Sequence, residues 1–248
     1  MVQAILVIFF FISVAISFLS SSAISDLLQQ KEEDKITHCK EIANKINYWY
    51  QNNAFEIDSI ESTVTPPFTV NYRGGTILSS KRLDCHNGVK GHVFVVAIPT
   101  LEDLKTTIDP DTGEVKKGVY DVVEVVNGCE IEKKLFEESD KKAKNIAAWL
   151  ESYYKAKSLS DAYGHKNYFA SNSCGGWGDI PCTTNSSAKI LKKYIGGHDE
   201  DFITAYNTEM IFDNSSEHVN LNVPPYSCRV GFMLPWGDIK WTIATEQT

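Results

Sequence analysis

Two pairs of adjacent histidine and cysteine residues, His38-Cys39 and Cys85-His86, carry the side chains that most often bind zinc. Together they form a candidate Cys2His2 site. Their spacing is not that of a zinc finger, and adjacent residues on a helix, as expected for His38 and Cys39, point in different directions. The pattern therefore favours a disulfide bond with incidental histidines, and we assign no metal ligand.

Two acidic loops offer oxygen ligands for calcium. The stretch DPDTGE (109–114) lacks the full pattern of a calcium loop, which has glycine at position six and glutamate at position twelve. Asp, Pro and Gly are the residues that tight turns require, so this stretch favours a hairpin turn. The stretch GGHDEDF (196–202) is explained by a helix that ends at Gly196-Gly197 and by an N-cap at Asp199. We therefore expect no cofactor, with calcium as the alternative.

The six cysteines are the remaining reactive candidates. An even number behind an apolar N-terminus favours disulfides formed outside the cytosol. Cys174 and Cys182 flank the short, glycine-rich loop CGGWGDIPC, which can bend to close a bridge, so they are the preferred pair. A nucleophilic Cys174 with a distant histidine is the less favoured alternative. The partners of the other four stay open: Cys39, Cys85, Cys129 and Cys228.

Catalytic motifs are absent from the sequence. It contains no Walker loop, dinucleotide fingerprint, serine-nucleophile elbow or HExxH motif, so we predict that the protein is not an enzyme. The 248 residues carry a net charge of −8, which disfavours nucleic acid as the main partner. Trp177, Trp236 and Trp241 are candidates either for a carbohydrate or partner surface or for core positions.

The N-terminal stretch is either a retained apolar helix or a signal peptide. No charge occurs in the first 25 residues, and residues 1–24 match the length of about 20 apolar residues that a transmembrane helix needs. A signal peptide has a basic N-terminal region, whereas the first lysine here is Lys31. No proline or glycine precedes Asn53, which predicts one continuous helix with an apolar first half and an amphipathic second half. The alternative is a signal peptide cut within Ser20–Ser25.

Sheet and helix patterns alternate after this helix. Residues 66–99 and 109–128 are rich in β-branched residues and contain turn signals, which predicts strands. A second amphipathic helix is expected over 130–157, and two further strands around the turn at 235–238. The segments EIANKINYWYQ and NIAAWLESYYK share an order of residues, which suggests two helix-plus-sheet modules. The predicted parts are the apolar helix half 1–25, a first module 26–128 and a second module 129–248.

A retained apolar helix that continues into an amphipathic helix, packed on a small antiparallel sheet, resembles the type IV pilins and the pseudopilins of type II secretion. The stretch DEDFITAYNTEMIFDNSS resembles a pseudopilin segment in which an acidic turn and an aromatic residue precede a strand. The stretch PPYSCRVGFMLPWGDIKWTIAT is similar to the closing hairpin of such proteins. The resemblance implies an α+β fold: a long N-terminal helix, transmembrane in its apolar half, packed on antiparallel sheet, with a second amphipathic helix and further strands.

The same resemblance implies a structural subunit of a bacterial type IV pilus or type II secretion-type filament, anchored in the inner membrane and facing the periplasm before assembly. Its partners would be other pilin-like subunits, and the packing side chains would be Ile5, Leu6, Phe9, Phe10, Ile12 and Ile16. No basic leader is seen and residue five is Ile5 instead of the family's glutamate, which implies a minor, tip-located subunit. The alternatives are a secreted disulfide-bonded binding protein and a membrane-anchored periplasmic enzyme.

Overall fold

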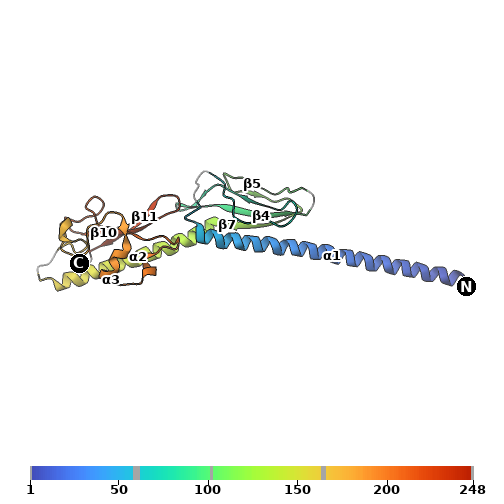
Figure 1. Cartoon of the computed structure of the whole chain (residues 1–248), viewed down its shortest axis with the longest axis horizontal. Helices are drawn as coiled ribbons and strands as arrows, with labels where there is room; N and C mark the ends of the chain where they lie inside the picture. The colour runs from blue at the N-terminus through green and yellow to red at the C-terminus, as the bar shows by residue number, and fades with distance from the viewer. Residues whose placement is uncertain (1, 58–61, 101–102, 163–165, 247–248) are drawn as a thin grey trace. The chain divides into compact units, whose positions relative to one another are not determined.

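The chain folds into two compact units, each assembled from segments that are distant in the sequence (Figure 1). The computed structural model describes residues 2–57, 62–100, 103–162 and 166–246, with side chains from residue 24 onward. Unit 1 contains residues 1–46, 65–80 and 94–126, and unit 2 contains residues 47–64, 81–93 and 127–248. Both units combine helix with antiparallel strands, so the predicted α+β class is confirmed.

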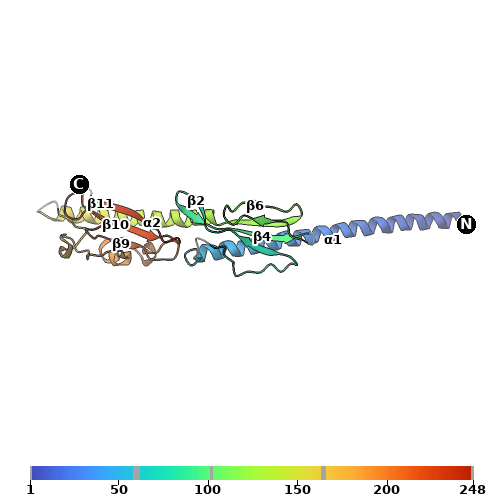
Figure 2. The ribbon, with the colours of Figure 1, turned by 90° about the horizontal axis from the view of Figure 1, so that it is seen from above.

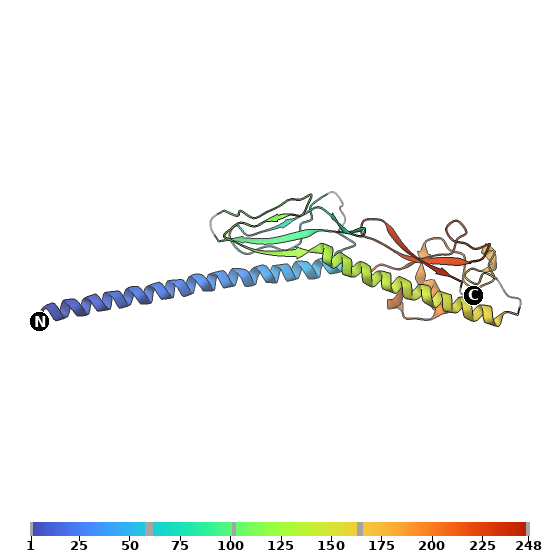
Figure 3. The same ribbon diagram turned by 180° about the vertical axis from the view of Figure 1, so that it is seen from behind.

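Helix α1 (Val2–Asn53) is continuous, as the absence of proline and glycine predicts. In unit 1 its residues Cys39, Ile42 and Ile46 are buried, and their spacing of three and four places them on one face. Figure 3 shows this part of α1 running along the sheet of unit 1. The side chains of residues 2–23, which make up most of the predicted apolar half, lie outside the described part.

A search of the described residues finds no helix with the length and apolar character needed to cross a bilayer.

The sheet of unit 1 has the strand order β1-β4-β7, with β1 (Thr76–Ser79), β4 (Val93–Pro99) and β7 (Asp121–Asn127). Strand β1 pairs with β4 in antiparallel register from Thr76↔Ala97 to Ser79↔Phe94. Residues 94–98 of β4 are all buried, which is the pattern of a strand covered on both faces. A hairpin of β5 (Thr107–Ile108) and β6 (Val115–Lys116) completes the unit.

Unit 2 is built around helix α2 (Gly128–Ser160), which starts two residues before the predicted helix. The Asn127 side chain explains the earlier start, because its Oδ1 accepts a hydrogen bond of 3.0 Å from the Cys129 N–H. A short hairpin, β2 (Leu83–His86) and β3 (Val89–Gly91), packs near this end of α2. Its turn is the predicted Asn87-Gly88, and both residues have positive φ.

The second sheet of unit 2 has the order β11-β10-β9-β8, and α2 lies along β10 and β11 (Figure 2). Its strands are β8 (Ser186–Ser187), β9 (Ile211–Asp213), β10 (Ser227–Met233) and β11 (Ile239–Thr245). The β10–β11 hairpin pairs from Ser227↔Thr245 to Met233↔Ile239 and confirms the expected strands around 235–238. Between α2 and β9 lie short helices: η1 (Asn172–Cys174), η2 (Ala188–Leu191), α3 (Lys192–Ile195) and η3 (Asp199–Phe202).

Two details of the sequence interpretation differ from the structure. The N-cap of η3 is His198, not Asp199, because the carboxylate of Asp201 reaches back 2.7 Å to the His198 N–H. The helix before it ends at Gly196, as expected. The two units are also not the contiguous modules 26–128 and 129–248, since residues 47–64 and 81–93 group with α2 in unit 2.

Candidate functional site

The exposed stretch of α1 at residues 24–34 is the first candidate site. Every side chain in it is exposed, including Ile24 at 58%, Leu27 at 58% and Leu28 at 62%. Packing against unit 1 begins at Lys35, whose Nζ donates a 3.1 Å hydrogen bond to the carbonyl of Pro99. Because most helical stability in proteins comes from tertiary packing, this stretch gains little from the rest of unit 1.

The six predicted packing residues, from Ile5 to Ile16, lie further toward the N-terminus on the same helix. The backbone of α1 is helical through all of them, but their side chains belong to residues 2–23 and lie outside the described part. Their role therefore remains a prediction.

Two disulfides link described residues, both in unit 2. Cys174 and Cys182 are joined, as the sequence predicts. Cys85 is joined to Cys129, which ties the β2–β3 hairpin to the first turn of α2. This hairpin comes so close to α2 that a Cβ on Gly91 would lie 2.9 Å from the Cys129 backbone nitrogen, so only glycine fits there.

Cys39 and Cys228, which the sequence offered as disulfide candidates, are buried free thiols. Burial raises the pKa of Cys39 to about 11, with a further contribution from Glu124, and burial raises the pKa of Cys228 well above its usual value. Neither is poised as a thiolate nucleophile. An even number of cysteines in the sequence cannot distinguish a buried free cysteine from a bonded one.

The candidate zinc ligands do not come together. Cys85 is bonded to Cys129, while Cys39 lies in the core of unit 1. His38 Nε2 instead accepts a 3.3 Å hydrogen bond from the backbone N–H of Asn71. Among the described residues no group of three or more His, Cys, Asp or Glu side chains is arranged to hold a metal ion.

The acidic stretch 109–114 forms the expected turn between β5 and β6. Oδ1 of Asp109 accepts hydrogen bonds from the backbone N–H groups of Asp111, at 2.8 Å, and Thr112, at 3.1 Å. These bonds lower the pKa of Asp109. One carboxylate oxygen is thus used by the turn itself.

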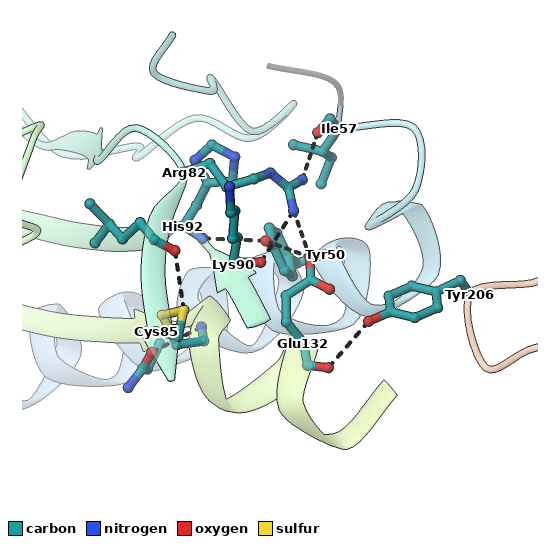
Figure 4. Close-up of polar contacts among 11 residues, drawn as sticks. Tyr50, Ile57, Arg82, Cys85, Lys90, His92, Glu132 and Tyr206 are labelled. Carbon is teal, nitrogen blue, oxygen red and sulfur yellow. Dashed lines mark hydrogen bonds and ion pairs between the residues drawn. A yellow bond between two sulfur atoms is a disulfide. The ribbon is translucent and has the colours of Figure 1, made fainter. Parts of the chain in front are cut away.

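A buried ion pair between Arg82 and Glu132 is the second candidate site (Figure 4). The two side chains are 1% and 0% exposed, and NH1 of Arg82 lies 3.2 Å from Oε1 of Glu132. The hydroxyl of Tyr50, at the end of α1, donates a 3.0 Å hydrogen bond to the same oxygen. Arg82 also donates to the carbonyls of Ile57 and Lys90, at 2.9 and 3.2 Å.

Around Glu132 the polar network is only partly satisfied. The Oε2 atom of Glu132 has no hydrogen-bond partner among the described residues. The hydroxyl of Tyr206 donates a hydrogen bond of 3.3 Å to the backbone carbonyl of Glu132. Burial raises the pKa of Glu132 to about 7, although Arg82 and the Tyr50 hydroxyl oppose this shift. Burial likewise raises the pKa of Tyr50 and Tyr206. The cluster can therefore hold a proton at Glu132 near neutral pH. Its hydrogen bonds also link the end of α1, the start of the β2–β3 hairpin and helix α2 within unit 2.

Sequence reasoning missed this pair, although a signal was present. Glu132 lies on the same face of α2 as Ser139, Ala143 and Ile146, and all four are buried. A carboxylate therefore occupies a position on the buried face of the helix. A buried carboxylate needs a cationic or hydrogen-bonding partner. Arg82 carries no comparable sequence signal, because it lies in a short segment without clear periodicity.

A second buried carboxylate, Asp213, lies beside Ser215 and His218, residue types that could form a catalytic triad. Both Ser215 Oγ, at 3.1 Å, and Asp213 Oδ2, at 2.8 Å, approach the same atom, His218 Nδ1. A Ser-His-Asp relay needs the two partners on opposite ring nitrogens. NH2 of Arg229 also donates a hydrogen bond of 2.7 Å to Oδ2 of Asp213. We therefore interpret this cluster as a structural ion pair.

The three candidate tryptophans have different environments in unit 2. Trp236 is buried, and Trp241 is partly exposed with the Arg229 guanidinium 4.0 Å from its ring centroid. Trp177 is 62% exposed on the loop that the Cys174–Cys182 disulfide closes, with Lys166 Nζ 3.6 Å from its ring. Only Trp177 therefore presents a large aromatic surface on a covalently braced loop.

Searches of protein-family models, of curated proteins and of solved structures find no match to this chain.

Proposed function

We propose that this protein is a pilin-like structural subunit of a bacterial filament of the type IV pilus or type II secretion kind. The observation that carries the proposal is the one-sided support of α1: residues 24–34 are exposed all round, while Cys39, Ile42 and Ile46 are buried in unit 1. A stretch of helix that the rest of unit 1 leaves uncovered is available for contact with another molecule. An apolar sequence over residues 1–25 suits a bilayer and, after assembly, the same helix of neighbouring subunits.

Two further features are consistent with this proposal. Disulfides form and persist in oxidising compartments, which fits an inner-membrane protein whose folded units face the periplasm. Among the described residues, Asp213, Ser215 and His218 do not have the geometry of a catalytic triad, because Asp213 and Ser215 approach the same nitrogen of His218. The proposed partners are other pilin-like subunits, and the proposed contact is made through the N-terminal helix.

The test is the variant Phe10→Asp, expressed in the native host and assayed for entry into filaments. A carboxylate in an apolar helix contact is expected to abolish assembly, because an unpaired charge there is costly. Leu159→Asp is the matched control, since Leu159 is 80% exposed in unit 2 and its replacement should leave assembly unchanged. Intact disulfides in both variants would show that unit 2 still folds, and a Cys39 that resists alkylation would show the same for unit 1. Entry of Phe10→Asp into filaments at the wild-type level would contradict the proposal.

A secreted binding protein, released by removal of the N-terminal segment, is the second candidate. The exposed Trp177 favours it, because a rigid aromatic side chain on a braced loop is typical of a recognition surface. The two candidates differ in whether residues 1–23 are retained in the mature protein.

A further inference from the structure

A cavity of about 590 Å³ opens on unit 1 between the end of β6 and the start of β7. Its size falls within the range of about 300–1,000 Å³ that is common for binding sites. The cationic lining residues are Lys105, Lys116 and Lys117, and the apolar ones are Val119 and Tyr120. Val119 is 89% exposed and Tyr120 is 65% exposed, so both present apolar surface at the cavity.

The rim of this cavity is held in one conformation by Asp121. Its Oδ2 accepts hydrogen bonds from the backbone N–H groups of Lys105, at 2.9 Å, and Thr106, at 2.7 Å, and from the Thr106 hydroxyl, at 2.7 Å. Gly118 packs directly against this carboxylate, where a Cβ would collide with it. The exposed side chains of the cavity are therefore presented by a fixed loop.

The charge of the cavity is opposite to that of the chain as a whole. The protein carries a net charge of −8, whereas three lysines line the cavity against two carboxylates, those of Asp103 and Asp121. The Asp121 carboxylate is occupied by the backbone of the rim. Asp103 approaches Lys105 at 3.9 Å, whereas no ion pair to Lys116 or Lys117 occurs among the described residues. The cavity thus suits an occupant that carries several carboxylates next to apolar side chains.

The exposed stretch of α1 at residues 24–34 has that composition. It carries four carboxylates against the one cation of Lys31, and the carboxylates belong to Asp26, Glu32, Glu33 and Asp34. Leu27 and Leu28 add exposed apolar surface next to them. Within one molecule this stretch of α1 does not occupy the cavity, since all side chains of residues 24–34 are exposed.

We propose that the cavity of one copy of this chain receives the acidic stretch 24–34 of α1 from a second copy. Lys116 and Lys117 pair with Glu32 and Glu33, while Val119 and Tyr120 cover Leu27 and Leu28. Because the two surfaces differ, a pair of copies keeps one cavity and one acidic stretch free, on different copies, and the contact can repeat along an open assembly. This inference deepens the proposed filament function and rests on it for its biological role, but the contact itself needs only two copies.

The experiment places a photo-crosslinking residue in the cavity of the full chain, purified in detergent micelles. Tyr120→p-benzoylphenylalanine is irradiated, and the cross-linked peptide is identified by mass spectrometry. The expected product is a dimer in which residue 120 is joined to a peptide within residues 24–35 of the other copy. Attachment only to other peptides, or only to copurified lipid, would overturn the proposal, the latter in favour of a lipid-headgroup site.

Charge reversal supplies the second arm. Lys116→Glu with Lys117→Glu, or Glu32→Lys with Glu33→Lys, should each lower the cross-linking yield about tenfold, because like charges then face one another. A mixture of the two reversed chains, with the crosslinker in the first, should recover the wild-type yield to within about twofold. Lys133→Glu with Lys134→Glu is the matched control, because both lysines are exposed on α2 in unit 2.

The outcomes separate this inference from the filament proposal. An unchanged yield in the reversed chains, or no recovery in the mixture, overturns the inference even when filaments form. A third result is a cross-link that is lost in the reversed chains and recovered in their mixture, in a protein that never enters filaments. That result supports the contact and contradicts only the filament function.

Discussion

Arg82 and Glu132 show how a single buried pair can control the stability of unit 2. Removing one member of a buried ion pair strands the other charge, which typically costs about 3–5 kcal/mol. We expect Arg82→Ala to lower the free energy of unfolding of unit 2 by about that amount at pH 8, where Glu132 is ionised. Chemical denaturation followed by tryptophan fluorescence measures it. Arg73→Ala is the control, since Arg73 is exposed in unit 1, and an equal loss in both variants would contradict the assignment.

Glu132 also predicts a pH dependence with a definite sign. Its folded-state pKa of about 7 is above the ordinary glutamate value of 4.5, so its contribution to stability is complete below about pH 4.5 and is lost as the pH rises through 7. The free energy of unfolding of unit 2 should therefore fall between pH 5 and pH 8. Glu132→Gln should flatten this dependence, because glutamine does not titrate. A variant that keeps the wild-type slope would assign the dependence to other groups.

The two buried thiols predict how many cysteines per chain can be alkylated before and after unfolding. In the native, non-reduced protein, Cys39 and Cys228 should resist alkylation, because both are buried and burial raises their pKa. After unfolding in guanidinium without a reductant, two alkyl groups should be added per chain. Intact mass spectrometry gives the number, and a chain with no free thiol after unfolding would show a third disulfide.

At the scale of elements, α1 should be the least protected helix at residues 24–34. Helix segments without tertiary packing open locally at low cost. Trypsin should therefore cut the unassembled protein within α1 after Lys31 before it cuts α2 after Lys133 or Lys134, because the turns of α2 on both sides of these lysines carry buried residues. Mass spectrometry of early digestion products tests the order. In assembled material the same site should be protected, and equal cleavage in both states would argue against any contact there.

Elements with strong local patterns could be predicted from the sequence, and those made by long-range contacts could not. The absence of breakers before Asn53 indicated α1, the apolar run at 93–99 indicated β4, and the turn residues at 109–114 indicated the β5–β6 hairpin. The Cys85–Cys129 bond joins residues 44 apart, and no local pattern selects it among the possible pairings. The Arg82–Glu132 pair has the same cause, since it joins two distant segments whose proximity only the fold decides. The lysine cavity is local to residues 103–121, but no residue pattern there marks a cavity.

For the whole molecule, everything proposed about function depends on the fate of the N-terminal half of α1. If residues 1–23 are retained, the exposed stretch 24–34 joins an apolar helix to a folded unit, and its uncovered leucines and carboxylates have a partner in the assembly. If cleavage occurs near Ile24, the same stretch becomes a terminal helix that frays, and the braced Trp177 becomes the more informative surface.

Intact mass and N-terminal sequencing of the protein from its native host, without reductant, decide between these states. We expect a chain that retains residues 5–16, because a helix continuous with the packed face of unit 1 is most useful when its apolar part stays attached. The mass should also be lower by the four hydrogens that two disulfides remove. A mature start within residues 24–27 would contradict the filament proposal and would leave the secreted binding protein as the better account.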